Sequence, residues 1–182
     1  IQHWEKIIED GTDIFGGETY FVLAHSHELA ENTETAIKYY QTVIERYPKT
    51  YYAYRVPWIL GDLYRMIGNY EKSIYWYDQQ TQDPTKTLKP RTLFSKGCIY
   101  LFDLKDPKNA EEIFETYINR YPEGENIQTT HYCLGLCYSQ LGNIKRAIEI
   151  LEDASKKYKG TIFEKDINTL LTELKNKEDQ LR

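Results

Sequence analysis

The sequence predicts an all-α fold, a solenoid built from antiparallel pairs of helices. Small residues recur every 37 positions, and a large apolar residue follows each of them after four positions. These pairs are Ala36 and Tyr40, Ser73 and Tyr77, Ala110 and Phe114, and Ala147 and Leu151. Within each unit the apolar residues follow helical spacing, and helix-breaking pairs such as Gly68-Asn69 divide the unit in two. A repeat of this length is typical of stacked helix hairpins, because one hairpin cannot bury its apolar face alone.

Four helix pairs are expected in order along the chain, at about 17–50, 54–84, 90–122 and 128–160. Residues 1–16 are expected to form an N-terminal helix, which fits a truncated earlier unit. Residues 161–182 are expected to form a C-terminal capping helix, since Ile167, Leu170 and Leu174 share one stripe. Lys175 stands where the fourth unit has Tyr138, and a terminal helix needs such a polar outer face.

Glycines inside the first helix of each pair point to close packing. Gly61, Gly97 and Gly135 each cost about 1 kcal/mol relative to alanine in a helix. We expect the missing side chain to let the second helix approach, with the large residue after each small one filling the space.

Two further features interrupt the pattern of the pairs. The third unit carries one extra residue between its helices, where Asp106 can cap and Pro107 can occupy the first turn. Pro57 predicts either the start of a helix or a kink in it.

The composition is that of a chain with its own hydrophobic core and no strong net charge. With 182 residues and 41% hydrophobic content the chain can bury the core of one or two domains. The net charge of −5 gives no general attraction to nucleic acid or to anionic membranes. No apolar run approaches the roughly 20 residues that span a bilayer, so we expect no direct membrane insertion. The three cysteines are expected to be small buried residues, in a protein of the cytoplasm or of a bacterial periplasm.

Two stretches carry a family resemblance: "PWILGDLYRMIGNYEKSIYWYDQQTQDP" and "HYCLGLCYSQLGNIKRAIEILEDA". Their small and large signature positions resemble the tetratricopeptide repeat over about residues 17–160, with 37 residues per unit against the usual 34 of the family. The resemblance implies a right-handed superhelix whose first helices line a concave groove. The segment "AIKYYQTVIERYPKTYYAYRV" is similar to bacterial cell-envelope members, namely the lipoprotein subunit of outer-membrane barrel assembly and the periplasmic coordinator of the Tol-Pal system.

The resemblance also implies which side chains face the groove. They are aromatic in every unit and interleaved with charged residues: Phe21, His25, Arg55, Trp58, Asp62, Arg65, Arg91, Phe94, Phe102 and Tyr132. Rings beside guanidinium groups are enriched at interface hot spots, so we expect a partner peptide with apolar anchors and an acidic group. The alternative is that the rings pack between neighbouring first helices and only hold the stack. Members that clamp chaperone tails use Lys and Asn where this chain has Phe21, His25, Ile59 and Ser95, so that activity is not expected.

No set of residues typical of catalysis, cofactor binding or metal binding is apparent. His25 and His27 are two positions apart and point away from each other on a helix. Cys133 and Cys137 are four positions apart, but cysteine fills small gaps in packed helices. We therefore expect a non-catalytic scaffold that binds another protein. The alternatives are a module that assembles into a homo-oligomer and a sensor domain of a larger regulatory or envelope complex.

Overall fold

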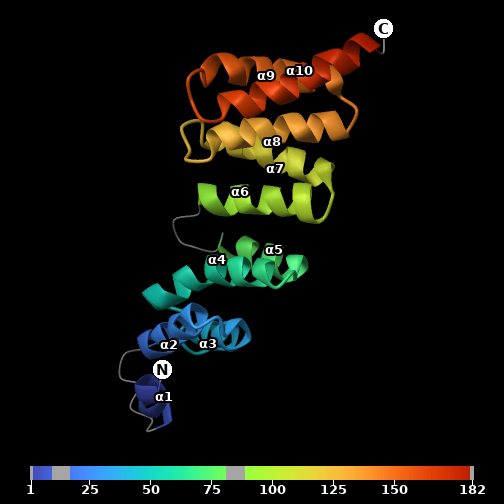
Figure 1. Ribbon diagram of the computed structural model, residues 1–182. Coiled ribbons are helices and arrows are strands. Elements are labelled where there is room, and N and C mark those ends of the chain that lie inside the picture. The colour runs from blue at the N-terminus through green and yellow to red at the C-terminus, as the bar shows by residue number, and fades with distance from the viewer. Residues whose placement is uncertain (1, 10–16, 81–88, 181–182) are drawn as a thin grey trace. The chain divides into compact units, whose positions relative to one another are not determined.

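Every regular element in the described part of the chain is a helix. The computed structural model describes residues 2–9, 17–80 and 89–180, and it divides into two compact units, Ile1–Thr87 and Leu88–Arg182. The units are treated separately below as unit 1 and unit 2. In both, successive helices run antiparallel as hairpins (Figure 1). The prediction of an all-α fold made of helix pairs is confirmed for the described residues.

Unit 1 holds a short helix and two hairpins. Its helices are α1 (Gln2–Glu9), α2 (Glu18–Leu29), α3 (Thr33–Arg46), α4 (Tyr51–Met66) and α5 (Tyr70–Gln79). One apolar cluster joins α2, α3 and α4, with Ala36, Tyr40 and Leu60 inaccessible to solvent. Residues 10–16 and the side chain of Trp4 lie outside the described part, so that end of the predicted N-terminal helix is not tested.

Unit 2 holds two hairpins and a terminal helix. Its elements are α6 (Pro90–Cys98), the π-helical turn η2 (Ile99–Asp103), α7 (Pro107–Arg120), α8 (Ile127–Gln140), α9 (Ile144–Lys157) and α10 (Glu164–Gln180). A second apolar cluster runs from α6 to α10. In α10 the stripe of Ile167, Leu170 and Leu174 is buried, while Lys175 is exposed and its ammonium lies 2.6 Å from the Glu152 carboxylate.

The helix glycines mark the close approach of each hairpin. A Cβ added to Gly61 would lie 2.3 Å from the ring of Tyr77. The same atom would lie 2.5 Å from Phe114 at Gly97 and 2.8 Å from Leu151 at Gly135. Atoms this close cannot coexist, so only glycine lets the second helix approach to this distance. The predicted pairing of each glycine with the large residue of its own hairpin is confirmed.

The turns between paired helices share one backbone pattern, and the third turn is one residue longer. The N–H groups of Asn69 and Asn143 donate to carbonyls five residues earlier, each at 2.8 Å. In the third hairpin the N–H of Asp106 donates to the carbonyl of Tyr100, six residues earlier, also at 2.8 Å. Tyr100 lies in the π-helical turn η2, whose wider turn accommodates the extra residue. Asp106 caps α7 by accepting from the Asn109 N–H at 3.1 Å, as predicted.

The start of α4 lies before the expected start of the second helix pair. α4 begins at Tyr51, ahead of the predicted second pair, because the Thr50 hydroxyl accepts from the Ala53 N–H at 3.3 Å and caps the helix there. Pro57 therefore lies inside α4 and does not start it, and its ring is buried.

Candidate protein-binding surfaces

The predicted groove residues are divided between the two units. Those of unit 1 are Phe21 and His25 on α2, and Arg55, Trp58, Asp62 and Arg65 on α4. Those of unit 2 are Arg91 and Phe94 on α6, Phe102 in η2, and Tyr132 on α8. A single groove that runs through all four repeats stays a prediction, and the surfaces below belong to one unit each.

Unit 1 brings two of the predicted residues, Phe21 and Arg55, into contact. The guanidinium carbon of Arg55 lies 5.6 Å from the ring centroid of Phe21 and 5.7 Å from that of Tyr51. The ring of Tyr52 lies 5.2 Å from that of Phe21. We call Phe21, Tyr51, Tyr52 and Arg55 the Phe21 cluster. Tyr51 is 67% exposed and Arg55 is half-buried, so the cluster presents an exposed ring beside a partly exposed cation.

Contacts with α2 and α3 hold the Phe21 cluster in place. Phe21 meets the buried ring of Tyr40 edge-on at 5.5 Å, which joins it to the α2–α3 hairpin. Burial and a hydrogen bond to the Glu18 carboxylate raise the pKa of Tyr52, so its hydroxyl stays protonated and donates to Glu18. Each cation–ring contact at such an exposed site contributes about 0.5–1 kcal/mol. The cluster is therefore held in place before any partner binds.

Three other predicted residues of unit 1, His25, Trp58 and Asp62, make contacts within that unit. Asp62 accepts a hydrogen bond from the Tyr77 hydroxyl at 2.5 Å. The Nδ1 atom of His25 lies 3.3 Å from Glu28. Trp58 is half-buried against the apolar cluster of the unit. The Asp62–Tyr77 bond joins the first helix α4 to the second helix α5, whereas the His25–Glu28 contact lies within α2.

The predicted aromatic residues of unit 2 differ in how far they pack against other helices. Phe94 lies 6.1 Å from the ring of Phe114 and 6.2 Å from that of Tyr117, and so joins α6 to α7. Tyr132 is half-buried, and burial raises its pKa. Phe102 is 43% exposed. Phe94 therefore packs on the second helix of its own hairpin.

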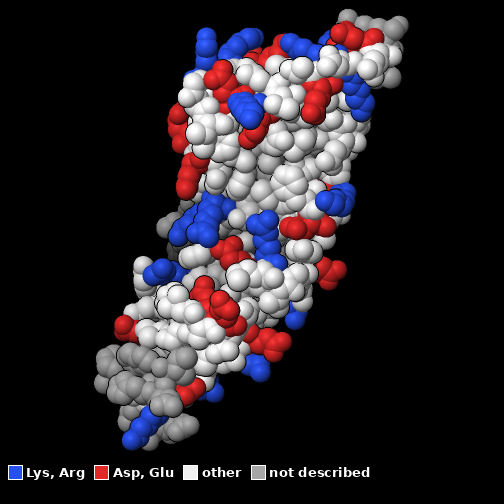
Figure 2. Space-filling view, viewed as in Figure 1, with Lys and Arg blue, Asp and Glu red and all other residues white. Residues whose placement is uncertain are grey.

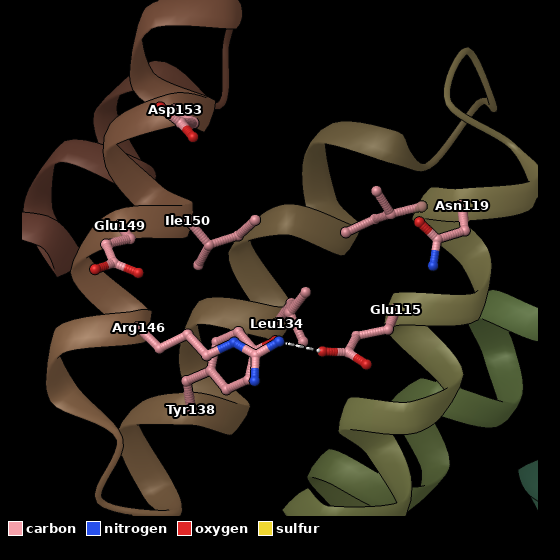
Figure 3. A pocket seen from close by; sticks show the side chains of 9 residues that line it. Glu115, Asn119, Leu134, Tyr138, Arg146, Glu149, Ile150 and Asp153 are labelled. Atoms are coloured by element: carbon pink, nitrogen blue, oxygen red, sulfur yellow. Dashed lines mark hydrogen bonds and ion pairs between the residues drawn. The ribbon is translucent and has the colours of Figure 1, made fainter.

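A second surface, which sequence reasoning did not single out, lies between the second helices of unit 2. It is a pocket of about 420 Å³, which we call the outer pocket, and its lining comes from α7, α8 and α9. The lining residues are Glu115, Ile118, Asn119, Leu134, Tyr138, Arg146, Glu149, Ile150 and Asp153. Figure 3 shows Arg146, Glu149 and Asp153 in succession along α9, opposite Glu115 and Asn119.

One edge of the outer pocket is a closed set of three polar contacts. The Tyr138 hydroxyl donates to Glu115 at 2.5 Å, and Arg146 donates to the same carboxylate oxygen at 3.0 Å. The guanidinium also lies over the Tyr138 ring, 4.6 Å from its centroid. Burial and the hydrogen bond to Glu115 raise the pKa of Tyr138, which keeps the donor protonated.

Unit 1 repeats this arrangement with a glutamine amide in place of the carboxylate and a lysine in place of the arginine. Gln41 donates to the Tyr64 hydroxyl at 3.3 Å, and the Lys72 ammonium lies 5.2 Å from the Tyr64 centroid. In the register of the repeat Gln41 corresponds to Glu115, Tyr64 to Tyr138 and Lys72 to Arg146. The shared register is the sequence signal that could have revealed this contact.

A pocket of about 320 Å³ lies between the second helices of unit 1. Aromatic residues and prolines dominate its lining, which consists of Ile44, Pro48, Ala53, Tyr54, Pro57, Tyr75, Trp76, Gln79 and Gln80. The corresponding surfaces of the two units therefore differ in chemistry.

The described residues offer no centre for metal binding or thiol chemistry. Among them no group of three or more His, Cys, Asp or Glu side chains is arranged to hold a metal ion. Burial raises the pKa of Cys137 to about 12. A hydrogen bond with Cys98, together with burial, raises the pKa of Cys133. All three thiols are buried and, as thiols, weak nucleophiles.

On the visible face of each unit Lys and Arg side chains are interspersed with Asp and Glu, without a continuous basic stripe (Figure 2). None of the helices in the described segments is both long enough and apolar enough to cross a bilayer.

Comparison with known protein families identifies the type of repeat that these hairpins form. Models of the tetratricopeptide repeat match residues 18–50, 90–123 and 129–156, which together make up more than half of the 182 residues. The matches include the first, third and fourth predicted pairs. The α4–α5 hairpin lies between the matched segments and has the same contact of a glycine with a large residue, Gly61 with Tyr77. The fold and the surfaces define a helical-repeat protein of the kind that binds other proteins. The chain belongs to the tetratricopeptide repeat family.

Solved structures agree on the fold. A tetratricopeptide repeat protein from Parabacteroides merdae is 18% identical and superposes with a TM-score of 0.75 over 90% of this chain, which spans only 62% of that protein. YrrB, a TPR protein with an unusual peptide-binding site, is 15% identical with a TM-score of 0.67, over 96% of this chain and 82% of its own. MamA from Desulfovibrio magneticus is 16% identical with a TM-score of 0.65, over 91% of this chain and 97% of its own. No curated protein sequence matches the chain.

Proposed function

We propose that this protein is a non-catalytic scaffold that binds a peptide segment of a partner protein at the Phe21 cluster. The partner segment supplies an apolar side chain for the rings and a carboxylate for Arg55. The description of YrrB as a TPR protein with an unusual peptide-binding site supports peptide binding as a use of this fold.

The observation that carries the proposal is that the guanidinium of Arg55 lies over the rings of Phe21 and Tyr51. A guanidinium stacked on rings keeps its N–H edge available for a carboxylate, because the edge lies in the plane of the group. Tyr51 is the most exposed ring of the cluster and offers apolar contact area beside that edge. Ring and cation together therefore provide both kinds of contact that a hot spot needs.

Selection from a random display library of dodecapeptides on the immobilised 182-residue chain tests the proposal. We expect the selected peptides to share an acidic residue beside an aromatic or aliphatic one. Isothermal titration of a selected peptide should then show binding about tenfold weaker to Arg55→Gln than to the unchanged chain, since a charged hydrogen bond contributes roughly 1.5–3 kcal/mol.

Arg120→Gln is the matched control, since Arg120 is an exposed arginine in the last turn of α7, outside the Phe21 cluster. Phe21→Leu keeps the volume near that of the ring and should weaken binding while leaving the helix content by circular dichroism unchanged. Selected peptides without acidic residues, or equal affinity for Arg55→Gln and Arg120→Gln, would rule out the Phe21 cluster as the binding surface.

A further inference from the structure

We propose that the outer pocket of unit 2 binds an arginine or lysine side chain of a partner protein, in a segment where apolar residues flank the basic one. This inference does not depend on peptide binding at the Phe21 cluster. It rests on three observations: the rim of the pocket is acidic, its floor is apolar, and acidic and apolar lining residues alternate along α9.

The rim of the outer pocket keeps negative charge after its internal pairing. Glu115, Glu149 and Asp153 are three carboxylates, and Arg146 is the single basic residue of the lining. Arg146 is engaged by Glu115 and by the Tyr138 ring. Glu149 makes no hydrogen bond or ion pair with the part of the chain that the structure describes. Asp153 meets Lys156 at 3.6 Å, but both side chains are more than three-quarters exposed, so solvent screens that pair.

The floor of the outer pocket is apolar. Leu134 is buried, and Ile118 and Ile150 are half-buried beside it. The volume of about 420 Å³ falls within the roughly 300–1,000 Å³ of clefts that hold ligands. Arginine and lysine match such a site, since their methylene stems cover apolar surface while the charged head reaches the carboxylates.

The layout of the outer pocket favours a protein segment over a small free cation. Arg146, Glu149 and Asp153 follow one another along two turns of α9, and Ile150 adds an apolar contact between them (Figure 3). A small cation could contact the carboxylates but would leave the apolar floor uncovered. A segment with a basic residue between apolar ones can contact Glu149, Asp153 and Ile150 together.

Titration of the uniformly ¹⁵N-labelled 182-residue chain with short peptides tests the inference. The probes are acetylated peptide amides of sequence Leu-Arg-Leu-Arg-Leu, Leu-Gln-Leu-Gln-Leu and Leu-Glu-Leu-Glu-Leu, and N-acetylarginine methylamide as the free cation. We expect the arginine peptide to shift the amide signals of α7 and α9 around Glu115 and Asp153. It should bind at least fivefold more tightly than the glutamine peptide, and the glutamate peptide should not bind.

Two double variants separate the effect of the rim carboxylates on binding from the effect of the net charge of the chain. Glu149→Gln with Asp153→Asn should weaken binding of the arginine peptide at least fivefold. Glu112→Gln with Asp179→Asn removes the same number and kind of exposed charges outside the lining, on α7 and α10, and should change the affinity less than twofold.

Four results would overturn the inference: no binding of the arginine peptide, equal binding of the glutamine peptide, equal losses in both double variants, or equal binding of N-acetylarginine methylamide. The last result would assign the pocket to small cations. Because all four substituted residues are at the surface, circular dichroism should show the same helix content in every variant.

Discussion

Single residues set how closely the helices of each hairpin approach. The same glycine position faces a tyrosine ring in the second hairpin, a phenylalanine ring in the third and a leucine in the fourth. A ring in a closed site has no room to turn away, whereas the branched end of a leucine can adopt another rotamer. The cost of adding one methyl group should therefore differ between hairpins that look alike.

Gly61→Ala should lower the free energy of unfolding by about 2 kcal/mol, because the new Cβ would lie 2.3 Å from the fully buried ring of Tyr77 and overpacking outweighs the gain in helix propensity. Gly135→Ala should cost less than about 1 kcal/mol, since the leucine atoms at 2.8 Å can shift. Urea unfolding followed by circular dichroism measures both variants. Equal losses at the two sites would show that the ring of Tyr77 moves as easily as Leu151.

A residue with positive φ follows the first helix of every hairpin. Substitutions at these residues test how much the left-handed backbone conformation costs in stability. Gly142 has φ 81° and nothing within 4 Å of a would-be Cβ, so Gly142→Ala should cost about 1 kcal/mol through the backbone alone. Lys105 has φ 55° in the third turn and already carries that strain. Lys105→Gly should therefore leave the midpoint of thermal unfolding unchanged or raise it, and a fall in that midpoint would contradict this account.

At the scale of elements, one contact recurs between consecutive hairpins with different chemistry. Glu115 binds the Tyr138 hydroxyl, Gln41 binds that of Tyr64, and Glu152 meets Lys175 where α10 has no ring. The same position of the repeat thus supplies a hydrogen bond inside the stack and an ion pair at the terminal helix. An exposed ion pair suits that end because the outer face of a terminal helix meets water.

The sequence predicted what depends on a single hairpin and missed what depends on several. The pairing of Gly97 with Phe114 and the cap at Asp106 follow from neighbouring positions, so the repeat register was sufficient. The outer pocket needs side chains from α7, α8 and α9 at once, and which of them converge is decided by packing between hairpins. Phe94 shows a different limit within one hairpin, because its repeat position suggests a groove residue, while its ring packs on Phe114 and Tyr117 of the paired helix α7.

His131 couples α8 to the end of α9 and makes the stability of unit 2 depend on pH. Its Nδ1 donates to the Ile127 carbonyl at 2.8 Å and lies 3.2 Å from the Tyr158 hydroxyl. Burial lowers the pKa of His131 in the folded chain and outweighs the hydrogen bond to the Ile127 carbonyl, which raises it. The unfolded chain, with a pKa near 6.5, then takes up a proton that the folded chain resists, so the free energy of unfolding falls as the pH drops below about 6.5.

His131→Gln should remove this part of the pH dependence. The variant loses some stability at pH 7.5, and its further loss between pH 7.5 and 5.5 should be smaller than that of the unchanged chain. The other histidines are present in both proteins, so the difference between the two urea-unfolding series isolates His131. Parallel curves over this pH range would mean that the imidazole takes up its proton equally in the folded and unfolded chains.

At the scale of the whole molecule, the buried apolar residues form separate clusters. The residues of one cluster lie between Tyr20 and Tyr64, and those of the other lie between Leu93 and Leu174. In a helical repeat each hairpin stabilises chiefly its direct neighbours, so local damage need not spread along the chain. The two units should therefore respond separately to substitutions in their cores.

Hydrogen exchange of the intact 182-residue chain, followed by mass spectrometry, measures this separation. Gly61→Ala should speed amide exchange in α2 to α5 by roughly tenfold or more, as a loss above about 1.4 kcal/mol implies, and leave α8 and α9 unchanged. Gly135→Ala should reverse the pattern with a smaller amplitude, since its strain lies between α8 and α9 in the other cluster. Equal acceleration throughout the chain in either variant would mean that both clusters unfold as one cooperative body. A substitution in one unit would then alter binding at the surfaces of both, so the Phe21 cluster and the outer pocket could not be probed independently.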